Sequence, residues 1–168
     1  MIILFEGKGI HSMLPASLYT DLYLRYSILP AISLDGVLHL DILTWSWTAD
    51  EFQPFVEVLL DRMNLYPEKN SVLVLDNASV HHFEDLHGLV EGQGMRLRYL
   101  PPYSPDLNPI KEGFSGMKAW IRKNNEYILG ELTGDDTYDL YTILWQAVFD
   151  SMTQENIVGW YKDSGYIV

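Results

Sequence analysis

The chain has no cysteine among its 168 residues, which excludes disulfide bonds and metal sites built from thiolates. It also has no apolar run long enough to cross a bilayer, and the apolar stretch Ile2–Phe5 is too short for the core of a signal peptide. We therefore expect an intracellular protein that does not bind membranes, and a location in the nucleus is compatible with the sequence.

The chain also has few positively charged residues. The sequence has 11 Lys and Arg against 23 Asp and Glu, a formal net charge of −12. Non-specific affinity for DNA comes mainly from cationic side chains that displace counterions, so a chain this acidic lacks the usual footprint of a nucleic-acid binder. If the chain handles DNA, a metal ion or another chain must supply much of the positive charge.

The rest of the composition is that of an ordinary globular protein, with 48% hydrophobic residues. The length suffices for one sizeable core, and no repeat, low-complexity tract or linker divides the chain. We expect a single domain over residues 1–168. The predicted order is a strand, a hairpin, a helix, a strand, a helix, a strand, a helix and a helical tail, which indicates an α/β fold with a mixed sheet.

Local signals set the expected boundaries outside the central region. Asp35-Gly36 predicts a two-residue turn between strands at 26–33 and 37–45, and Pro30 predicts a bulge or an edge position in the first of them. Thr48 and Glu51 have capping-box spacing for a helix, although Pro54 predicts a late start. Further helices are expected at 138–152 and from a cap at Ser151 to about Trp160.

The segment Ser71–Asp76 carries the first candidate site residue. Its four apolar residues, 72–75, predict a strand buried on both faces. Asp76 then lies at the carboxyl end of that strand, where open α/β sheets place their chemistry, and its carboxylate is a suitable ligand for a hard cation. The alternative is a simple strand-ending turn at Asp76-Asn77 with side-chain to backbone hydrogen bonds.

The second informative segment is a rigid loop that leads into a helix. A strand expected at 95–100 is terminated by Pro101-Pro102, and the loop continues to Glu112. Asn108 followed by Pro109 is a strong signal for the start of a helix, with Asn108 as the cap.

Three strings resemble the DDE-superfamily endonuclease domain of mariner-type transposases: Leu73–His81, Leu100–Ile110 and Gly159–Tyr166. The resemblance extends from about Arg25 to the C-terminus, and the string Tyr-Ser-Pro-Asp-Leu-Asn-Pro-Ile is highly specific. It implies a ribonuclease-H-like fold, two divalent ions (Mg²⁺ or Mn²⁺) and an acidic triad that cuts a DNA strand and joins its 3′ end elsewhere.

The resemblance assigns the triad one residue at a time. The second acid falls on Asp76, whereas the third falls on position 111, which is Lys111 here. The first belongs on a strand before the hairpin, and the available strand is the short one that ends in Glu6. The first strand is thus expected to be short or missing. As an alternative, Glu6 is an exposed turn residue.

Glu112 is the remaining candidate for the third acid and for a metal ligand. In a helix with Ile110 inward, Lys111 lies about 100° and Glu112 about 200° away around the axis. Glu112 is therefore expected to point away from Asp76, and its place in the first turn is better explained by the helix dipole.

An ammonium group at position 111 would pair with Asp76 and repel divalent ions. From the resemblance and this substitution we predict a transposase-derived DDE domain that is catalytically inactive. The alternative is a non-catalytic, exapted or remnant module whose acidic surface binds protein rather than DNA.

Overall fold

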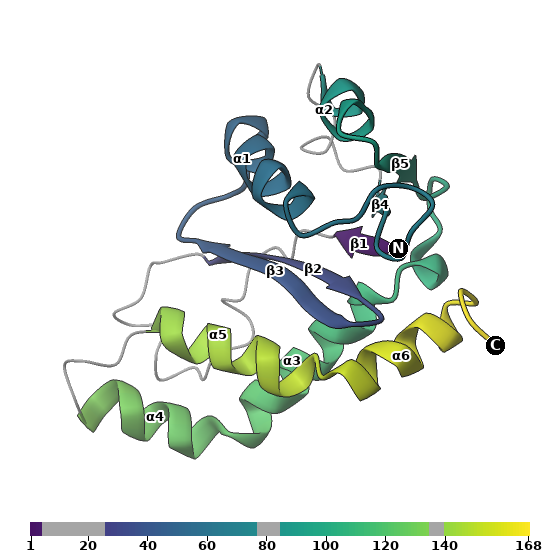
Figure 1. Cartoon of the computed structure of the whole chain (residues 1–168). Coiled ribbons are helices and arrows are strands. Elements are labelled where there is room, and N and C mark those ends of the chain that lie inside the picture. The colour runs from purple at the N-terminus through teal and green to yellow at the C-terminus, as the bar shows by residue number, and fades with distance from the viewer. Residues whose placement is uncertain (5–25, 77–84, 135–139) are drawn as a thin grey trace.

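The computed structural model describes residues 1–4, 26–76, 85–134 and 140–168, without the side chains of residues 3, 4 and 132–134. Figure 1 shows the described strands and helices. The strands are β1 (Ile2–Leu4), β2 (Ser27–Ser33), β3 (Gly36–Leu43), β4 (Val72–Leu75) and β5 (Arg96–Tyr99). The helices are α1 (Ala49–Leu60), α2 (Leu86–Gly92), α3 (Ile110–Lys123), α4 (Asn125–Gly134), α5 (Leu140–Ser151) and α6 (Gln154–Asp163), with a 3₁₀ turn at Pro105–Leu107.

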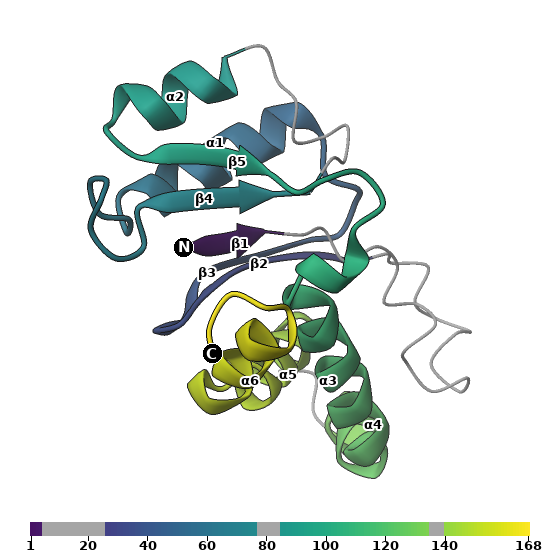
Figure 2. The ribbon, with the colours of Figure 1, turned by 90° about the vertical axis from the view of Figure 1, so that its right-hand side faces the viewer.

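The five strands form one mixed sheet in the order β3-β2-β1-β4-β5. β2 is antiparallel to both β1 and β3, whereas β1, β4 and β5 are parallel. Figure 2 shows these three strands pointing the same way, with the chain leaving β5 toward α3 at that end of the sheet. The mixed α/β sheet expected from the sequence is confirmed.

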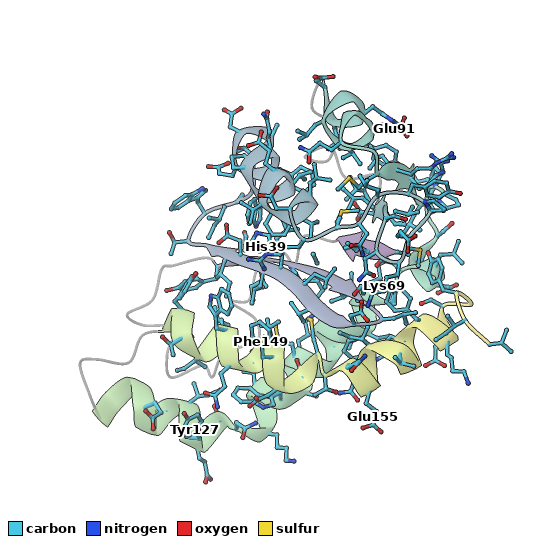
Figure 3. All side chains as sticks on the ribbon, viewed as in Figure 1. His39, Lys69, Glu91, Tyr127, Phe149 and Glu155 are labelled. Atoms are coloured by element: carbon cyan, nitrogen blue, oxygen red, sulfur yellow. The ribbon has the colours of Figure 1, made fainter. Side chains whose placement is uncertain are left out.

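Helices cover both faces of the sheet. α1 and α2 lie on one face, and α3, α5 and α6 lie on the other (Figures 1 and 2). On the first face, α1 packs against β3 through the rings of Phe55 and His39, whose centroids are 4.5 Å apart. Figure 3 shows His39 on β3. No helix in the described part of the chain is long and apolar enough to span a membrane.

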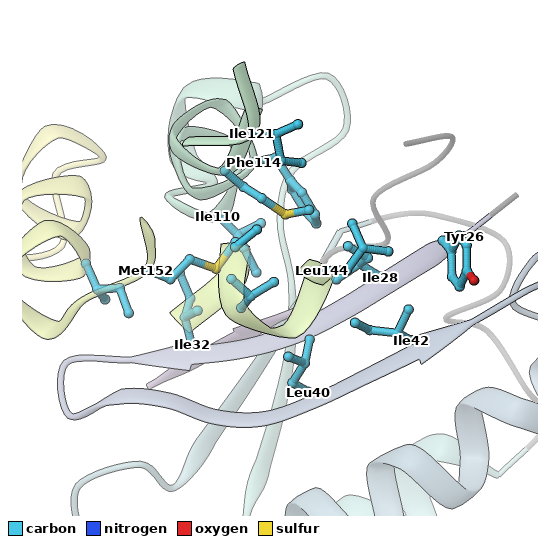
Figure 4. Close-up of a cluster of buried hydrophobic side chains, with 14 of the residues drawn as sticks. Tyr26, Ile28, Ile32, Leu40, Ile42, Ile110, Phe114, Ile121, Leu144 and Met152 are labelled. Carbon is cyan, nitrogen blue, oxygen red and sulfur yellow. The ribbon is translucent and has the colours of Figure 1, made fainter. Parts of the chain in front are cut away.

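β4 contributes side chains to both layers, as its continuous apolar sequence predicts. Leu73 and Leu75 belong to the core under α1 and α2. Val74 belongs to the core on the opposite face, which includes Ile110 and Leu144 (Figure 4). A strand of four residues is therefore held between two apolar layers, and this fixes the position of the residue that follows it.

The first strand is short, as expected, and it lies in the middle of the sheet. Ile2 pairs with Leu73 of β4, and Ile3 pairs with Ile32 of β2. Three residues of β1 therefore join the antiparallel hairpin to the parallel strands.

The hairpin departs from the sequence prediction in two details. Its turn residues are Leu34 and Asp35, because Gly36 already pairs with Ser33. Gly36 has φ of 118°, a conformation that glycine adopts more readily than other residues. The bulge predicted from Pro30 is present between Ala31 and Ile32, but the edge position is wrong because β2 has neighbours on both sides.

The capping box of α1 is confirmed: the Thr48 N–H donates to the Glu51 carboxylate at 3.0 Å. The predicted late start is wrong, since the helix begins at Ala49 and contains Pro54. Pro54 is only the sixth residue, and its missing N–H would have bonded to a carbonyl in the first turn.

The C-terminal region also differs from the prediction. α4 was not expected as a separate helix, and the predicted start of α5 at 138 lies outside the described residues. α6 is capped by Thr153 rather than Ser151 and extends to Asp163. Its Tyr161 hydroxyl donates to the Ile32 carbonyl at 2.9 Å, which joins the terminal helix to the β2 bulge.

Candidate functional site

Asp76 lies directly after β4, at the carboxyl end of the parallel strands. β5 continues this arrangement: Leu75 pairs with Tyr99, and the Leu100 N–H donates to the Leu75 carbonyl at 2.8 Å. The two strands therefore end side by side, and the proline-rich loop after Leu100 starts next to Asp76.

The loop is built from residues with restricted backbones. Pro101 and Pro102 stop the strand, and Pro105 opens the 3₁₀ turn. Tyr103 between them has φ of 56° and a fully exposed side chain. A left-handed conformation is uncommon for a residue with a Cβ atom, and such residues often occur at functional sites.

The loop and the start of α3 enclose a pocket of about 410 Å³ at the end of β4. We refer to it as the Asp76 pocket. Its lining comprises Asp76, Leu100, Pro101, Pro102, Tyr103, Ser104, Pro105, Asn108 and Lys111. The fold thus brings Asp76 and Lys111, two of the four predicted site residues, to the same pocket.

Asn108, in the loop before α3, has an environment that the sequence did not reveal. It was predicted to cap α3, with Pro109 as the first helical residue, but the helix begins at Ile110 with Pro109 in the N-cap position. The residue is 3% exposed, and neither its amide nitrogen nor its amide oxygen has a hydrogen-bond partner in the structure. Its backbone is satisfied, since its N–H donates to Pro105 and its carbonyl accepts from Lys111, at 3.1 and 3.2 Å. The Asn108 amide is therefore buried without a hydrogen-bond partner in a residue that lines the Asp76 pocket.

The first turn of α3 follows the predicted helical wheel. Ile110, Phe114, Met117 and Ile121 are buried. Lys111 is half-buried, whereas Glu112 is exposed and is not among the residues that line the Asp76 pocket.

Glu112 lies instead near the C-terminal end of α6. Partial removal from water raises the pKa of its carboxyl, and the negative charge of Asp163 raises that pKa further. The neighbouring charge that acts on the Glu112 carboxyl is thus negative.

The described residues at this site include few acidic side chains. Among the described residues that line the Asp76 pocket, one is a carboxylate, Asp76, and one is an ammonium group, Lys111. Within the described ranges, no three His, Asp or Glu side chains gather as a metal site would require. Glu6, the remaining predicted ligand, lies outside the described residues.

A second pocket, of about 540 Å³, lies at the opposite, amino-terminal end of β5. Its lining includes Tyr66, Glu91, Arg96 and Arg98, and the Arg96 guanidinium lies 4.1 Å from the centre of the Tyr66 ring. Stacking on an aromatic ring orients this guanidinium. The pocket is separated from Asp76 by the length of the strand.

A family model described as DDE superfamily endonuclease matches residues 23–130. The matched segment contains Asp76, the proline-rich loop and the first turn of α3. No curated protein matches the chain.

Solved structures show the same architecture. The Mos1 transposase catalytic domain with raltegravir and Mn is 15% identical, with a TM-score of 0.59, and the match covers 97% of this chain and 78% of that chain. The catalytic core domain of BIV integrase is 12% identical, with a TM-score of 0.58 and coverage of 99% and 97%. A simian T-cell lymphotropic virus intasome chain is 9% identical, with a TM-score of 0.60 and coverage of 93% and 52%. At these identities the similarity establishes the fold, which is ribonuclease-H-like.

Proposed function

The chain belongs to the DDE superfamily endonucleases, and we propose that it is a member that retains the fold but not the metal-dependent cleavage of DNA. The observation that carries this proposal is the placement of position 111. Lys111 lines the pocket beside Asp76, while the neighbouring acid, Glu112, lies toward Asp163.

The physical reason is electrostatic. Two divalent ions roughly 4 Å apart need several carboxylates from different elements. An ammonium group instead repels an ion at a separation of about 4 Å by about 4 kcal/mol per unit of ionic charge, at the effective dielectric constant of a protein surface. Lys111 therefore removes one ligand and adds a repulsion, and both effects disfavour Mg²⁺ and Mn²⁺.

Structures of similar proteins contain the divalent ions that Lys111 disfavours here. Mos1 transposase catalytic domains have been solved with Mn and with Mg. If this chain held such an ion, Asp76 would be a ligand, with Glu6 and Glu112 as the other candidates. The exposed position of Glu112, near a second carboxylate, favours its exclusion from that set.

DNA is the partner suggested by similarity. A Mos1 paired-end complex with the left transposon end is 15% identical, with a TM-score of 0.55, and the match covers 99% of this chain and 56% of that chain. The net charge of −12 opposes strong binding to DNA by this chain alone. The same charge favours the second candidate function, a non-catalytic module whose acidic surface binds a basic protein partner.

A nicking assay tests the loss of catalysis. We expect supercoiled plasmid to remain intact when the chain is incubated with Mg²⁺ or Mn²⁺. The chain with Asp76→Asn serves as the matched control, because it keeps the size of the side chain and removes its charge. Metal-dependent nicking by the native chain that disappears in Asp76→Asn would overturn the proposal.

A further inference from the structure

The outer edge of β3 is covered by side chains of the same protein chain. β3 has eight residues and lies at one end of the sheet, where β2 is its one strand neighbour in the described part of the chain. A strand at the end of a sheet leaves a row of backbone N–H and C=O groups without strand partners, and such a row can pair with a further strand. The outward backbone groups of β3 are therefore a potential contact surface.

Pro30 of β2 identifies these outward groups. In an antiparallel pair, opposite residues alternate between pairs that exchange two hydrogen bonds and pairs that exchange none. Pro30 has no N–H and lies opposite Leu40, so this pair is of the second kind. The backbone N–H and C=O of Leu40 therefore face away from β2. The alternation places Ile42, which lies opposite Ile28, in the same outward orientation.

Two charged side chains occupy backbone groups on either side of Leu40. The Asp41 carboxylate accepts a hydrogen bond from the Ile42 N–H at 2.8 Å. The Arg62 guanidinium, from the residue pair that follows α1, donates to the Leu38 carbonyl at 2.6 Å. A donor on one side of Leu40 and an acceptor on the other are thus already satisfied within the chain.

The two covered groups are complementary to each other in a second copy of the chain. In an antiparallel pair of two β3 strands centred on Leu40, Leu38 of one copy lies opposite Ile42 of the other, because both are two residues from the centre. The Ile42 N–H and the Leu38 carbonyl would then bond across the interface, twice by the two-fold symmetry. From this match we propose that β3 is a pairing surface for a second copy of the chain, and that Asp41 and Arg62 keep it closed.

The other end of the sheet has a similar arrangement. The N–H groups of Arg96 and Leu100 donate to carbonyls at 2.9 and 2.8 Å, on the side of β4. In a strand the residues between these contacts turn their backbone groups to the other side, so the Leu97 carbonyl faces outward. The Arg98 guanidinium donates to this carbonyl at 2.7 Å. Charged side chains thus cover outward groups on both end strands, as in proteins that resist association through sheet edges.

The test is to measure the association of the full chain by analytical ultracentrifugation after the two side chains on β3 are shortened or neutralised. We refer to Asp41→Ala combined with Arg62→Met as the edge variant, and we expect it to dimerise at least roughly tenfold more tightly than the native chain. Asp150→Ala combined with Arg122→Met is the matched control. It also removes one acid and one base, at exposed positions of α5 and α3, so both variants keep the net charge of −12.

Hydrogen exchange identifies the surface through which the edge variant associates. In a dimer centred on Leu40, the amide N–H groups of Leu40 and Ile42 bond to the second copy. Their exchange should therefore slow at least roughly tenfold between the dilute monomer and the dimer of the edge variant. In the control variant these two amides should exchange at the same rate at both concentrations.

Two results would overturn the proposal. One is equal association of the edge and control variants, and the other is a dimer of the edge variant in which exchange at Leu40 and Ile42 is unchanged. If the edge variant does not fold, Arg62→Met alone is compared with Arg122→Met, since both residues are exposed. Arg62→Met should associate more tightly, and equal association again overturns the proposal. None of these measurements involves the Asp76 pocket, so their outcome is independent of the proposed function.

Discussion

Asp76 and Lys111 line one pocket although they come from different elements, the end of β4 and the first turn of α3. The parallel pairing of β4 with β5 produces this relationship, because it ends both strands at the same edge of the sheet and starts the loop to α3 there. Position 111, where the resemblance places an acidic residue, therefore carries a cation beside Asp76.

Restoring an acid at position 111 should increase the affinity for divalent ions. In Lys111→Glu the repulsion is replaced by a second carboxylate beside Asp76. We expect Mn²⁺ to raise the Tm of this variant more than that of the native chain, because binding to the native state stabilises it. Lys118→Glu is the control with the same change of charge. Equal Mn²⁺ responses in the two variants would argue against a site at position 111.

Tyr161→Phe should destabilise the chain by removing one buried hydrogen bond. The Tyr161 side chain is 1% exposed, and its hydroxyl donates to the Ile32 carbonyl. Loss of such a bond costs about 1 kcal/mol, or about 2–4 °C in Tm for a protein of this size. The same change at the exposed Tyr141 is the control. An unchanged Tm would indicate that the hydrogen bond between Tyr161 and Ile32 adds no net stability to the folded state.

Leu73→Ala should be among the most damaging single changes. Leu73 is fully buried in β4, and truncating a buried leucine costs about 2–5 kcal/mol through lost transfer energy and a cavity. Val58→Ala, on the exposed side of α1, should have little effect. Chemical denaturation measures both values, and similar losses would contradict the burial of Leu73 in the core under α1 and α2.

His39 should make the chain less stable in mild acid. Burial lowers the pKa of the His39 imidazole, the charge of Arg62 lowers it further, and Asp41 opposes both. Because the unfolded imidazole takes up its proton at a higher pH than the folded one, stability falls as the pH drops below about 6.5. His39→Gln should show a smaller loss of Tm between pH 7.5 and pH 5.5. Identical pH profiles would exclude His39 as the source.

The sequence predicted the sheet and the position of Asp76 because these depend on short-range patterns. The apolar run at 72–75 and the polar residues on either side of it were sufficient for β4, and the helical period of α3 separated Lys111 from Glu112. The resemblance supplied the strand arrangement, which local patterns do not determine.

Other features depend on long-range packing and could not be read locally. Asn108 has the sequence context of a helix cap, yet its side chain is buried and makes no hydrogen bond. The proximity of Glu112 to Asp163 depends on how α6 packs against α3, which no local pattern specifies. The prediction for Glu6 remains a prediction, since this residue lies outside the described ranges.

The most direct test of the central claim is a calorimetric titration of the native chain and Asp76→Asn with Mn²⁺. An acidic surface binds divalent ions weakly at many places, so the informative quantity is the difference between the two proteins. We predict the same weak heats for both, because Lys111 keeps the ion away from Asp76. A tight site in the native chain that is lost in Asp76→Asn would contradict the account.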